Sequence, residues 1–458
     1  MSLFRIRALN PVQGDEREFF YDNITSKVLD ADGVQISFGE PQKAFCAMPT
    51  VSKDTPGKKH GNVTRLKIQL GLSCNYECSY CNQRFMPHAE EHTNPDSIEP
   101  FLQQLPSWFT GGGSNTGKGV TLEFWGGEPF VYWKTLKPLA EKLREMYPDI
   151  SFTMITNGSL LDIDKNEWLE NLNFNIGLSH DGPGYHVRGE DPLDDPIKKD
   201  IILDLWRRLG PKGQMSFNAM MNKHNQSRKA VAEFLTERLG FTPPIGEGTF
   251  IDPYDQDGKA VCFDTPAEHL TYRNTALTEL RDGHAQAFTT IAFKIDDFCK
   301  SLVSQRPASA LGQKCGMDRA DNIAVDLNGN VITCQNTSTS GIGMNGESHH
   351  IGHVSDLDAV EMKTSTHWSH REECSTCPVL QVCKGSCMFL HGDLWKTGCD
   401  ASFTDNVPIF AAAFEAMTGY LPFYIDGPQQ DDRKDIFGLV NGIPAPTKKP
   451  FPIPVVTG

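Results

Sequence analysis

The sequence predicts an α/β protein built around an open, partial barrel of six strand–helix units, a partial (β/α)6 barrel. From Leu66 onward, short apolar runs alternate with longer amphipathic segments, which is typical of parallel strands joined by helical crossovers. We count six such units, whereas a closed barrel of this type has about eight. Four short motifs rich in cysteine, glycine or polar residues each follow a predicted strand, and the loops after the strands carry the active sites of such barrels.

The elements follow one another in a regular order. Two short alternating runs predict strands at Leu3–Leu9 and Val34–Phe38, before a Lys/Gly-rich linker. The predicted barrel strands are Leu66–Leu72, Val120–Trp125, Ser151–Ile155, Phe174–Leu178, Met215–Met220 and Gly248–Ile251. The predicted helices are Ile98–Phe109, Tyr132–Met146, Ile197–Leu209, Arg228–Leu239 and, near the end of the chain, Ile409–Met417. A Pro-rich stretch at Ile443–Pro454 predicts an extended arm.

We divide the chain into four parts on this basis. They are an N-terminal β extension (1–64), the barrel (65–295), a cysteine-rich domain (296–405), and a C-terminal helix with the Pro-rich tail (406–458).

Composition narrows the possible functions. The net charge of −15, from 43 basic and 58 acidic residues, comes with no basic stripe, so we expect no nucleic-acid partner. No apolar run approaches the ~18–20 residues of a membrane span, and the first residues lack a secretory signal, so we expect a cytoplasmic protein without a membrane partner. Thirteen cysteines in a reducing compartment are better candidates for metal ligands or free thiols than for disulfides.

The first cysteine group, Cys74, Cys78 and Cys81, has the spacing C-x3-C-x2-C. Three thiolates on a [4Fe–4S] cluster leave one iron free to chelate the amino and carboxylate groups of a small molecule. A partial zinc site is the alternative, although zinc sites favour paired C-x2-C units. With the aromatic Tyr80 before the last cysteine, the triplet resembles the cluster-binding signature of the radical S-adenosylmethionine (SAM) enzymes.

Gly126, Gly127, Glu128 and Pro129 follow the second barrel strand. Glycine lets the backbone pass close to a ligand, and Glu128 offers acceptors for a cationic amino group. The run resembles the GGEP motif of radical SAM enzymes, and the resemblance implies that these four residues bind SAM. Three later candidates are Asn157, Ser179, where family members contact the ribose, and Arg188, which could pair with the methionine carboxylate. Each of the three could instead be a helix cap or a surface residue.

A second group of seven cysteines runs Cys315-x13-Gly329-x4-Cys334, then Cys374-x2-Cys377-x5-Cys383-x3-Cys387, and ends at Cys399. It resembles the SPASM domain of radical SAM enzymes that modify peptides and proteins. The resemblance implies two auxiliary [4Fe–4S] clusters, three clusters in all. Cys315, Cys334 and Cys387 would hold the first auxiliary cluster, and the second would be held by Cys374, Cys377, Cys383 and Cys399. One zinc ion held by Cys374, Cys377, Cys383 and Cys387 is the alternative.

Seven thiolates are one fewer than two fully ligated clusters require. Family members often supply the eighth from just upstream of the first motif cysteine, and Cys299 is the best match to that position. Cys46 and Cys262 are further candidates, and without any of them the first auxiliary cluster would keep an open iron.

The resemblance implies an enzyme that cleaves SAM to a 5′-deoxyadenosyl radical and oxidises a peptide or protein substrate, with electrons from a donor such as flavodoxin or ferredoxin. A cross-link (thioether, C–C or C–O) in a ribosomally made peptide is the first choice. Formylglycine formation as in sulfatase maturases is second, although those enzymes carry an acidic residue where this chain has Gln335. A small-molecule radical SAM dehydrogenase is a further candidate, and a non-catalytic iron–sulfur or zinc scaffold is the candidate from a different class. We identify no catalytic side chain from the sequence.

Overall fold

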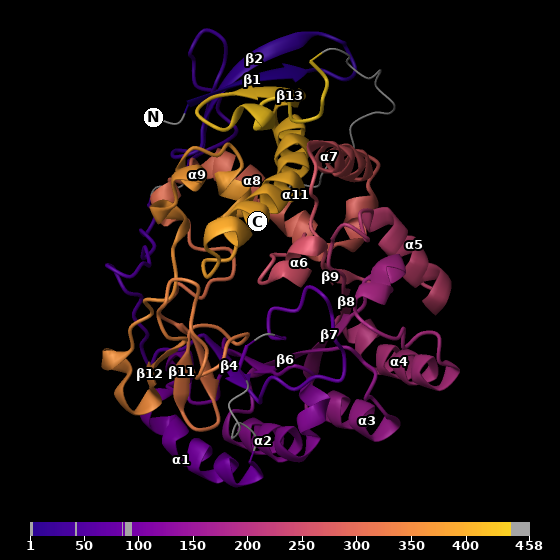
Figure 1. Cartoon of the computed structure of the whole chain (residues 1–458), viewed down its shortest axis with the longest axis vertical. Coiled ribbons are helices and arrows are strands. Elements are labelled where there is room, and N and C mark those ends of the chain that lie inside the picture. The colour runs from indigo at the N-terminus through magenta and orange to yellow at the C-terminus, as the bar shows by residue number, and fades with distance from the viewer. Residues whose placement is uncertain (1–2, 42–43, 85, 88–93, 441–458) are drawn as a thin grey trace.

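The computed structural model describes residues 3–41, 44–84, 86–87 and 94–440. Its central feature is a nine-stranded sheet in which six consecutive strands form the open barrel (Figure 1). These are β4 (Arg65–Gln69), β5 (Thr121–Trp125), β6 (Ser151–Thr156), β7 (Phe174–Ser179), β8 (Met215–Asn218) and β9 (Ile245–Glu247). Every neighbouring pair from β4 to β9 is parallel. The α/β fold class and the partial barrel are confirmed.

Helices connect the barrel strands and begin and end at residues suited to that role. The crossover helices are α1 (Ile98–Trp108), α2 (Trp133–Met146), α3 (Ile163–Asn171), α4 (Pro196–Leu209) and α5 (Arg228–Leu239). In α5, the Ser227 hydroxyl accepts a hydrogen bond from the Ala230 amide at the start, and Gly240 ends the helix in a left-handed conformation. The helix buries Val231 and Leu235, so its apolar face covers the barrel.

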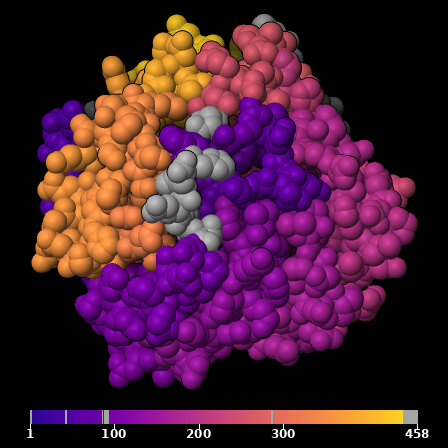
Figure 2. Space-filling view, turned by 60° about the horizontal axis from the view of Figure 1, so that its bottom comes forward, coloured from indigo at the N-terminus to yellow at the C-terminus, as the bar shows by residue number. Residues whose placement is uncertain are grey.

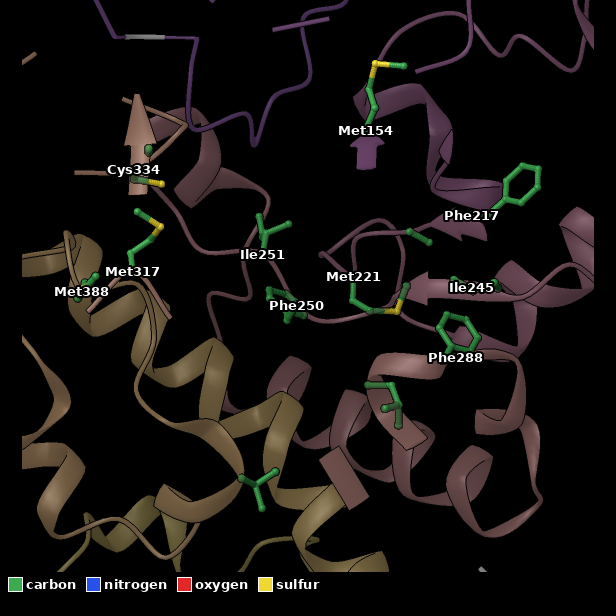
Figure 3. Packing of buried hydrophobic residues seen from close by; sticks show 14 of the residues in the cluster. Met154, Phe217, Met221, Ile245, Phe250, Ile251, Phe288, Met317, Cys334 and Met388 are labelled. Carbon is green, nitrogen blue, oxygen red and sulfur yellow. The ribbon is translucent and has the colours of Figure 1, made fainter. Parts of the chain in front are cut away.

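One predicted barrel strand needs correction, because the segment Gly248–Ile251 is not the sixth strand of the barrel. The strand β9 lies just before it, and Phe250 makes only an isolated bridge to Met221. Phe250 and Ile251 are nevertheless buried, and they explain the apolar pattern. Figure 3 shows both side chains between Met221 at the barrel and Cys334 in the C-terminal part of the chain.

The sheet does not stop at the barrel. Strand β10 (Asn322–Asp326) pairs in parallel with β4, and β11 (Asn330–Ile332) and β12 (His350–His353) extend the same sheet in antiparallel fashion. Gly329 turns the β10–β11 hairpin with a φ of 84°, as the LNGN run predicts. The cysteine-rich domain is thus joined to the barrel by backbone hydrogen bonds, which the sequence pattern did not indicate.

A second, four-stranded sheet has the order β13-β1-β2-β3. Its strands are β1 (Leu3–Leu9), β2 (Glu16–Asp22), β3 (Lys27–Leu29) and β13 (Leu421–Asp426). The prediction of β1 is correct, but Val34–Phe38 is not a strand, since Gln35 makes only one bridge, to Leu29. Strand β13 pairs antiparallel with β1, with Arg5 opposite Asp426. The N-terminal extension and the segment after the last cysteine therefore form one sheet (Figure 1).

Helices pack between the two sheets. They are α6 (Gln256–Ala260), α7 (Pro266–Arg281), α8 (Thr289–Ser304), the short α9 (Glu372–Ser375) and α10 (Leu380–Cys383), and α11 (Gly392–Thr418). The ring of Tyr21 on β2 lies 6.1 Å from that of Phe298 on α8 and 5.5 Å from that of Phe410 on α11. These contacts bury the second sheet against α8 and α11.

The C-terminal helix is longer than the Ile409–Met417 segment predicted. It runs unbroken from Gly392 to Thr418 and crosses the boundary that we place between residues 405 and 406. The Pro-rich stretch Ile443–Pro454 lies outside the described residues. In the described part of the chain, no helix has both the length and the apolar character needed to cross a membrane.

Candidate functional site

A cavity of about 540 Å³ opens at the carboxyl ends of the barrel strands. Its lining includes Cys78 and Cys81 from the triplet, Gly126 and Gly127 after β5, Ser179 at the end of β7, and Arg188. The chain segment that carries the triplet lies in the middle of this face, between the C-terminal domain (orange) and the barrel (magenta) (Figure 2). The structure therefore brings the predicted motifs to one place, at the end of the sheet where such barrels place their chemistry.

The cysteine loop is fastened to three neighbouring strand ends. The Ser73 carbonyl accepts a hydrogen bond from the Glu128 amide at 3.0 Å after β5. The Asn75 side chain accepts from the side-chain amide of Asn157 at 3.0 Å after β6. The Ser79 amide donates to the Val187 carbonyl at 2.9 Å in the segment after β7. These bonds fix the loop relative to the cavity before any ligand is considered.

Gly127 is required by the packing of this loop. A Cβ atom at Gly127 would lie 2.3 Å from the Ser73 carbonyl oxygen and 2.4 Å from that of Leu72, both of them backbone atoms. At Gly126 the nearest atoms, in the Tyr132 ring and the Gly71 carbonyl, would be 3.2 and 3.3 Å away. The sequence predicts glycine here because a ligand passes close to the backbone. The structure shows a second reason at Gly127, since the backbone that leads into Cys74 passes close to it.

Three of the predicted SAM-binding residues lie behind the cavity wall. The Glu128 carboxylate is buried and accepts hydrogen bonds from the Thr156 hydroxyl (2.7 Å), the Asn157 amide (2.8 Å) and the Phe130 amide (3.2 Å). Burial raises the pKa of Glu128, and these three donors oppose that rise. The carboxylate thus joins the ends of β5 and β6, while Pro129 begins the short turn after it. The structure does not bring Glu128, Pro129 or Asn157 into contact with the cavity.

Arg188 belongs to a buried polar cluster that also includes Tyr80 of the triplet. The Tyr80 hydroxyl donates to Asp181 at 2.6 Å and accepts from the Arg188 guanidinium at 3.0 Å. Asp181 is fully buried and lies 3.7 Å from Arg188. Burial raises the pKa of Tyr80 well above its usual range, so the phenol stays a neutral donor. The cluster holds the cationic end of Arg188 at the cavity wall.

We expect Tyr80→Phe to weaken both SAM binding and stability. The change removes a hydrogen-bond partner from both Asp181 and Arg188, which costs about 1–3 kcal/mol for a buried polar group. Isothermal titration with SAM and equilibrium unfolding check this. The matched control is Tyr76→Phe, because that hydroxyl donates to the backbone carbonyl of Glu190 at the exposed rim of the loop. If Tyr80→Phe and Tyr76→Phe reduced SAM affinity and stability equally, the structural role given to the Tyr80 hydroxyl would be wrong.

A second cavity, of about 530 Å³, collects three cysteines that are far apart in the sequence. Cys315, Cys334 and Cys387 all line it, which is the set expected for the first auxiliary cluster. Burial raises the pKa of Cys334 to about 12 and raises the pKa of Cys387. Thiols of this kind bind iron only on losing their protons. The loop after Cys315 is stabilised by Lys59, whose Nζ donates three hydrogen bonds of 2.7–2.8 Å to the carbonyls of Met317, Arg319 and Asn322.

A third, smaller pocket is lined by Cys374, Cys377, Cys383 and Cys399, the set expected for the second auxiliary cluster. Arg433, from the segment after β13, donates to the Cys399 sulfur at 3.5 Å. Cys387 lines the other cavity, which argues against one zinc ion shared by Cys374, Cys377, Cys383 and Cys387. Among the described residues, no three His, Cys, Asp or Glu side chains converge on the position of a single metal ion.

Cys299 lies away from both auxiliary sites. It is buried on α8, where its sulfur is 4.0 Å from the carbonyl oxygen of Ala413 on α11. Cys262 is also buried, with its sulfur 3.5 Å from the Gly258 carbonyl oxygen. Cys46 is exposed, and the lining of the cavity around Cys315 does not include it. The preference for Cys299 rested on sequence spacing, and the structure does not support it.

Sequence reasoning missed several residues of these sites. Asp252 and Tyr254 line both large cavities. The Asp252 carboxylate lies 3.3 Å from the Lys314 ammonium and accepts a hydrogen bond from the Ser386 hydroxyl, and the Tyr254 hydroxyl is hydrogen-bonded to the Cys387 sulfur. Their position just after a barrel strand was the available indication. Nothing in the sequence pattern pointed to Arg433.

The same domain provides a pH-dependent stability test. His367 is buried away from these cavities, and burial lowers its pKa from 6.5 to about 4. Between these values the unfolded chain binds a proton that the folded protein does not, so stability is lost as the pH falls. We expect His367→Gln to reduce the loss of unfolding free energy between about pH 7 and about pH 5 by about 2 kcal/mol at most, as measured by thermal unfolding at the two pH values. If the stability of His367→Gln fell with pH as steeply as that of the parent protein, this prediction would be wrong.

Comparisons with known proteins agree with the site. No protein-family model matches the chain. It is 25% identical over 171 residues to the radical SAM cyclopropyl synthase TigE of Paramaledivibacter caminithermalis, which covers 34% of this chain and 35% of that protein. It is 21% identical over 335 residues to a cysteine-type anaerobic sulfatase-maturating enzyme of Clostridium perfringens, covering 69% and 85%.

Among solved structures, native anSMEcpe with bound AdoMet and Kp18Cys peptide matches with a TM-score of 0.53 and 17% identity, over 77% of this chain and 99% of that one. The chain spans only 35% of the length of the cyclopropyl synthase, and 49% and 56% of two S-adenosylmethionine-dependent nucleotide dehydratases that it also matches. The likeness to the anSMEcpe structure is one of fold.

Proposed function

We propose that the chain is a radical SAM enzyme that oxidises a side chain of a peptide or protein, since it is similar in sequence to a radical SAM cyclopropyl synthase and to a cysteine-type anaerobic sulfatase-maturating enzyme. The first candidate reaction is a cross-link, a thioether, C–C or C–O bond, in a ribosomally synthesised peptide. One observation carries the proposal. The cavity beside the cysteine triplet and the cavity beside Cys315, Cys334 and Cys387 share the wall residues Asn82, Asp252, Tyr254 and Asn336.

The residues at the first cavity fit a [4Fe–4S] cluster with SAM. Cys74, Cys78 and Cys81 supply three soft thiolate ligands, and burial raises the pKa of Cys78 to about 11, so iron binding must displace its proton. Gly126, Gly127, Ser179 and Arg188 are the residues that would hold SAM against them. When bound, these groups supply a 5′-deoxyadenosyl radical. The protein contributes the position of the substrate and a site closed to water.

The auxiliary sites fit two further [4Fe–4S] clusters, which would make the reaction an oxidation by accepting an electron. The donor sets are Cys315, Cys334 and Cys387 in one cavity and Cys374, Cys377, Cys383 and Cys399 in the other. Arg433 and Tyr254 donate hydrogen bonds to ligand sulfurs, as expected of groups that orient and tune a cluster. A substrate in the first cavity would lie next to the first auxiliary site through the shared wall.

Formylglycine formation is the second candidate, because the chain resembles a cysteine-type sulfatase-maturating enzyme over 69% of its length. Gln335 weighs against it. This residue lines the second cavity directly after Cys334 and is neutral, where sulfatase maturases carry an acidic residue. A small-molecule oxidation is the third candidate. The peptide in the anSMEcpe structure favours a peptide substrate over that alternative.

Anaerobic reconstitution followed by a SAM-cleavage assay tests the proposal. With reductant, we expect 5′-deoxyadenosine from the parent protein and none above background from a variant with Cys74, Cys78 and Cys81 changed to Ala. That variant should keep the visible absorbance of the auxiliary clusters. Absence of the product from the parent would instead favour a non-catalytic iron–sulfur scaffold.

Mass spectrometry distinguishes the two peptide reactions. A cross-link removes two hydrogen atoms from the peptide, whereas formylglycine formation at cysteine also exchanges sulfur for oxygen. A cysteine-containing peptide of the kind bound in the anSMEcpe structure is the probe for the second candidate. A cytoplasmic location and an external donor such as flavodoxin or ferredoxin remain predictions.

A further inference from the structure

The ligand count at the auxiliary sites leaves one position to assign. The pocket around Cys399 has four cysteines, but the cavity around Cys315 has three. Cys299 and Cys262 are buried elsewhere, and Cys46 is exposed. The fourth ligand at the first auxiliary site is therefore to be sought among the other groups that line the same cavity.

His349 lines that cavity and is held firmly in its wall. Its amide donates to the Gly341 carbonyl at 2.9 Å, and its carbonyl accepts from the Thr333 amide at 3.0 Å, directly before Cys334. The imidazole is 1% exposed and packs edge-on against Phe389, two residues after Cys387, with ring centroids 5.5 Å apart. The histidine is thus flanked by the chain segments that carry two of the three cysteines.

The two ring nitrogens of His349 have different surroundings. The Nδ1 atom is hydrogen-bonded to the Thr333 hydroxyl at 2.7 Å, which fixes the plane of the ring. The Nε2 atom has no hydrogen-bond partner among the described residues. Metal-binding histidines show this division, with one nitrogen held by a neighbouring oxygen and the other left for the metal. Burial lowers the pKa of His349 to about 4, so the ring is neutral, as a ligand must be.

Two other polar groups on the wall, Asp252 and Tyr254, already have partners. The Asp252 carboxylate is paired with Lys314 and Ser386. Tyr254 is hydrogen-bonded to the Cys387 sulfur, which makes it a neighbour of a ligand. The Cys334 thiol donates a hydrogen bond to the side-chain oxygen of Gln335 at 3.2 Å, so that oxygen faces a cysteine already counted as a ligand.

We propose that His349 is the fourth protein ligand of the first auxiliary cluster, which would then have three cysteine ligands and one histidine ligand. This inference rests on the auxiliary-cluster part of the proposed function. Replacing one thiolate with a neutral imidazole removes a negative charge from the cluster and raises its reduction potential, as histidine ligation does in other iron–sulfur proteins.

The test uses the full chain with Cys74, Cys78 and Cys81 changed to Ala, so that only auxiliary clusters contribute. The protein is made with ¹⁵N-labelled histidine, reconstituted anaerobically and reduced, and its nitrogen hyperfine couplings are measured by pulsed EPR. We expect roughly eight irons per chain and a strongly coupled histidine nitrogen. The coupling should vanish in His349→Ala. His349→Cys should keep the iron, lose the coupling and lower the midpoint potential.

His367→Ala is the matched control, because that histidine is equally buried in the same domain but lies outside the cavity. It should keep both the coupling and the potential. A parent protein with roughly eight irons but no strongly coupled histidine nitrogen would overturn the assignment of His349 and leave the auxiliary clusters standing. Nitrogen coupling that survives in His349→Ala would do the same. Loss of half the iron in Cys46→Ala without nitrogen coupling would assign the position to Cys46 instead. A parent that binds no iron would overturn the auxiliary clusters themselves.

Discussion

Changing Gly127 to Ala is expected to reduce SAM cleavage by about 100-fold or more, because the added methyl group collides with the backbone that leads into the cysteine triplet. The two nearest atoms, the carbonyl oxygens of Ser73 and Leu72, would lie 2.3 and 2.4 Å from the new Cβ. A flexible side chain could move aside, but both of these are backbone atoms, and the Ser73 carbonyl is held by the hydrogen bond from the Glu128 amide. Displacements of about 1 Å at a reacting centre can cost 100-fold in rate.

The measurement is the rate of 5′-deoxyadenosine formation, with iron content measured in parallel. Gly126→Ala is the matched control, since its Cβ would come no closer than 3.2 Å to Tyr132, and we expect a loss of less than about 10-fold. A Gly127→Ala enzyme that retains parental activity and iron would show that the loop tolerates the shift.

Changing Asp405 to Asn is expected to destabilise the protein by about 3–5 kcal/mol, since it removes the negative partner of the buried Arg228 and of the partly buried Lys294. Asp405 is 1% exposed. It pairs with Arg228, accepts a hydrogen bond from the Tyr272 hydroxyl at 2.7 Å and lies 3.9 Å from the Lys294 ammonium. The change leaves the buried Arg228 and the partly buried Lys294 without that countercharge.

Denaturation by guanidinium chloride of the reconstituted protein checks this prediction. Glu141→Gln is the control, because Glu141 forms an exposed pair with Lys137, and such pairs contribute about 0.5 kcal/mol or less. A second variant with both Arg228→Met and Asp405→Leu should be more stable than Asp405→Asn, since replacing both partners leaves no lone charge at that pair. Equal denaturation midpoints for Asp405→Asn and the parent would contradict the account.

The barrel could be predicted because its strands carry buried residues at regular spacing and end in distinctive motifs. Leu66 and Ile68 of β4, for example, are fully buried, and they alternate with polar residues in the strand that leads to the triplet. The second sheet could not be predicted in the same way. Strand β13 is a short run beyond the last cysteine, and its pairing with β1 depends on contacts between residues far apart in the sequence.

The site shows the same contrast. The resemblance of the cysteine pattern to a known family implies the two sets of cysteines that the cavities bring together. Spacing could not place Cys299, because a helix side chain can face either a cavity or the core, and here it faces α11. The hydrogen bonds of Glu128 could not be predicted from the sequence either, because its partners Thr156 and Asn157 belong to the end of the next strand.

The pairing of β1 with β13 has a consequence for how the chain reaches its native state. Arg5 lies opposite Asp426, so this ladder joins residues about 420 positions apart. Contacts of such high sequence separation form late, because the chain must first give up the conformational freedom of everything between them. During synthesis, one edge of β1 therefore stays unpaired until β13 has emerged, and such edges are prone to aggregation. Cys399 lies on the helix that directly precedes β13, so the cluster that we propose at Cys399 would also be completed only late in synthesis.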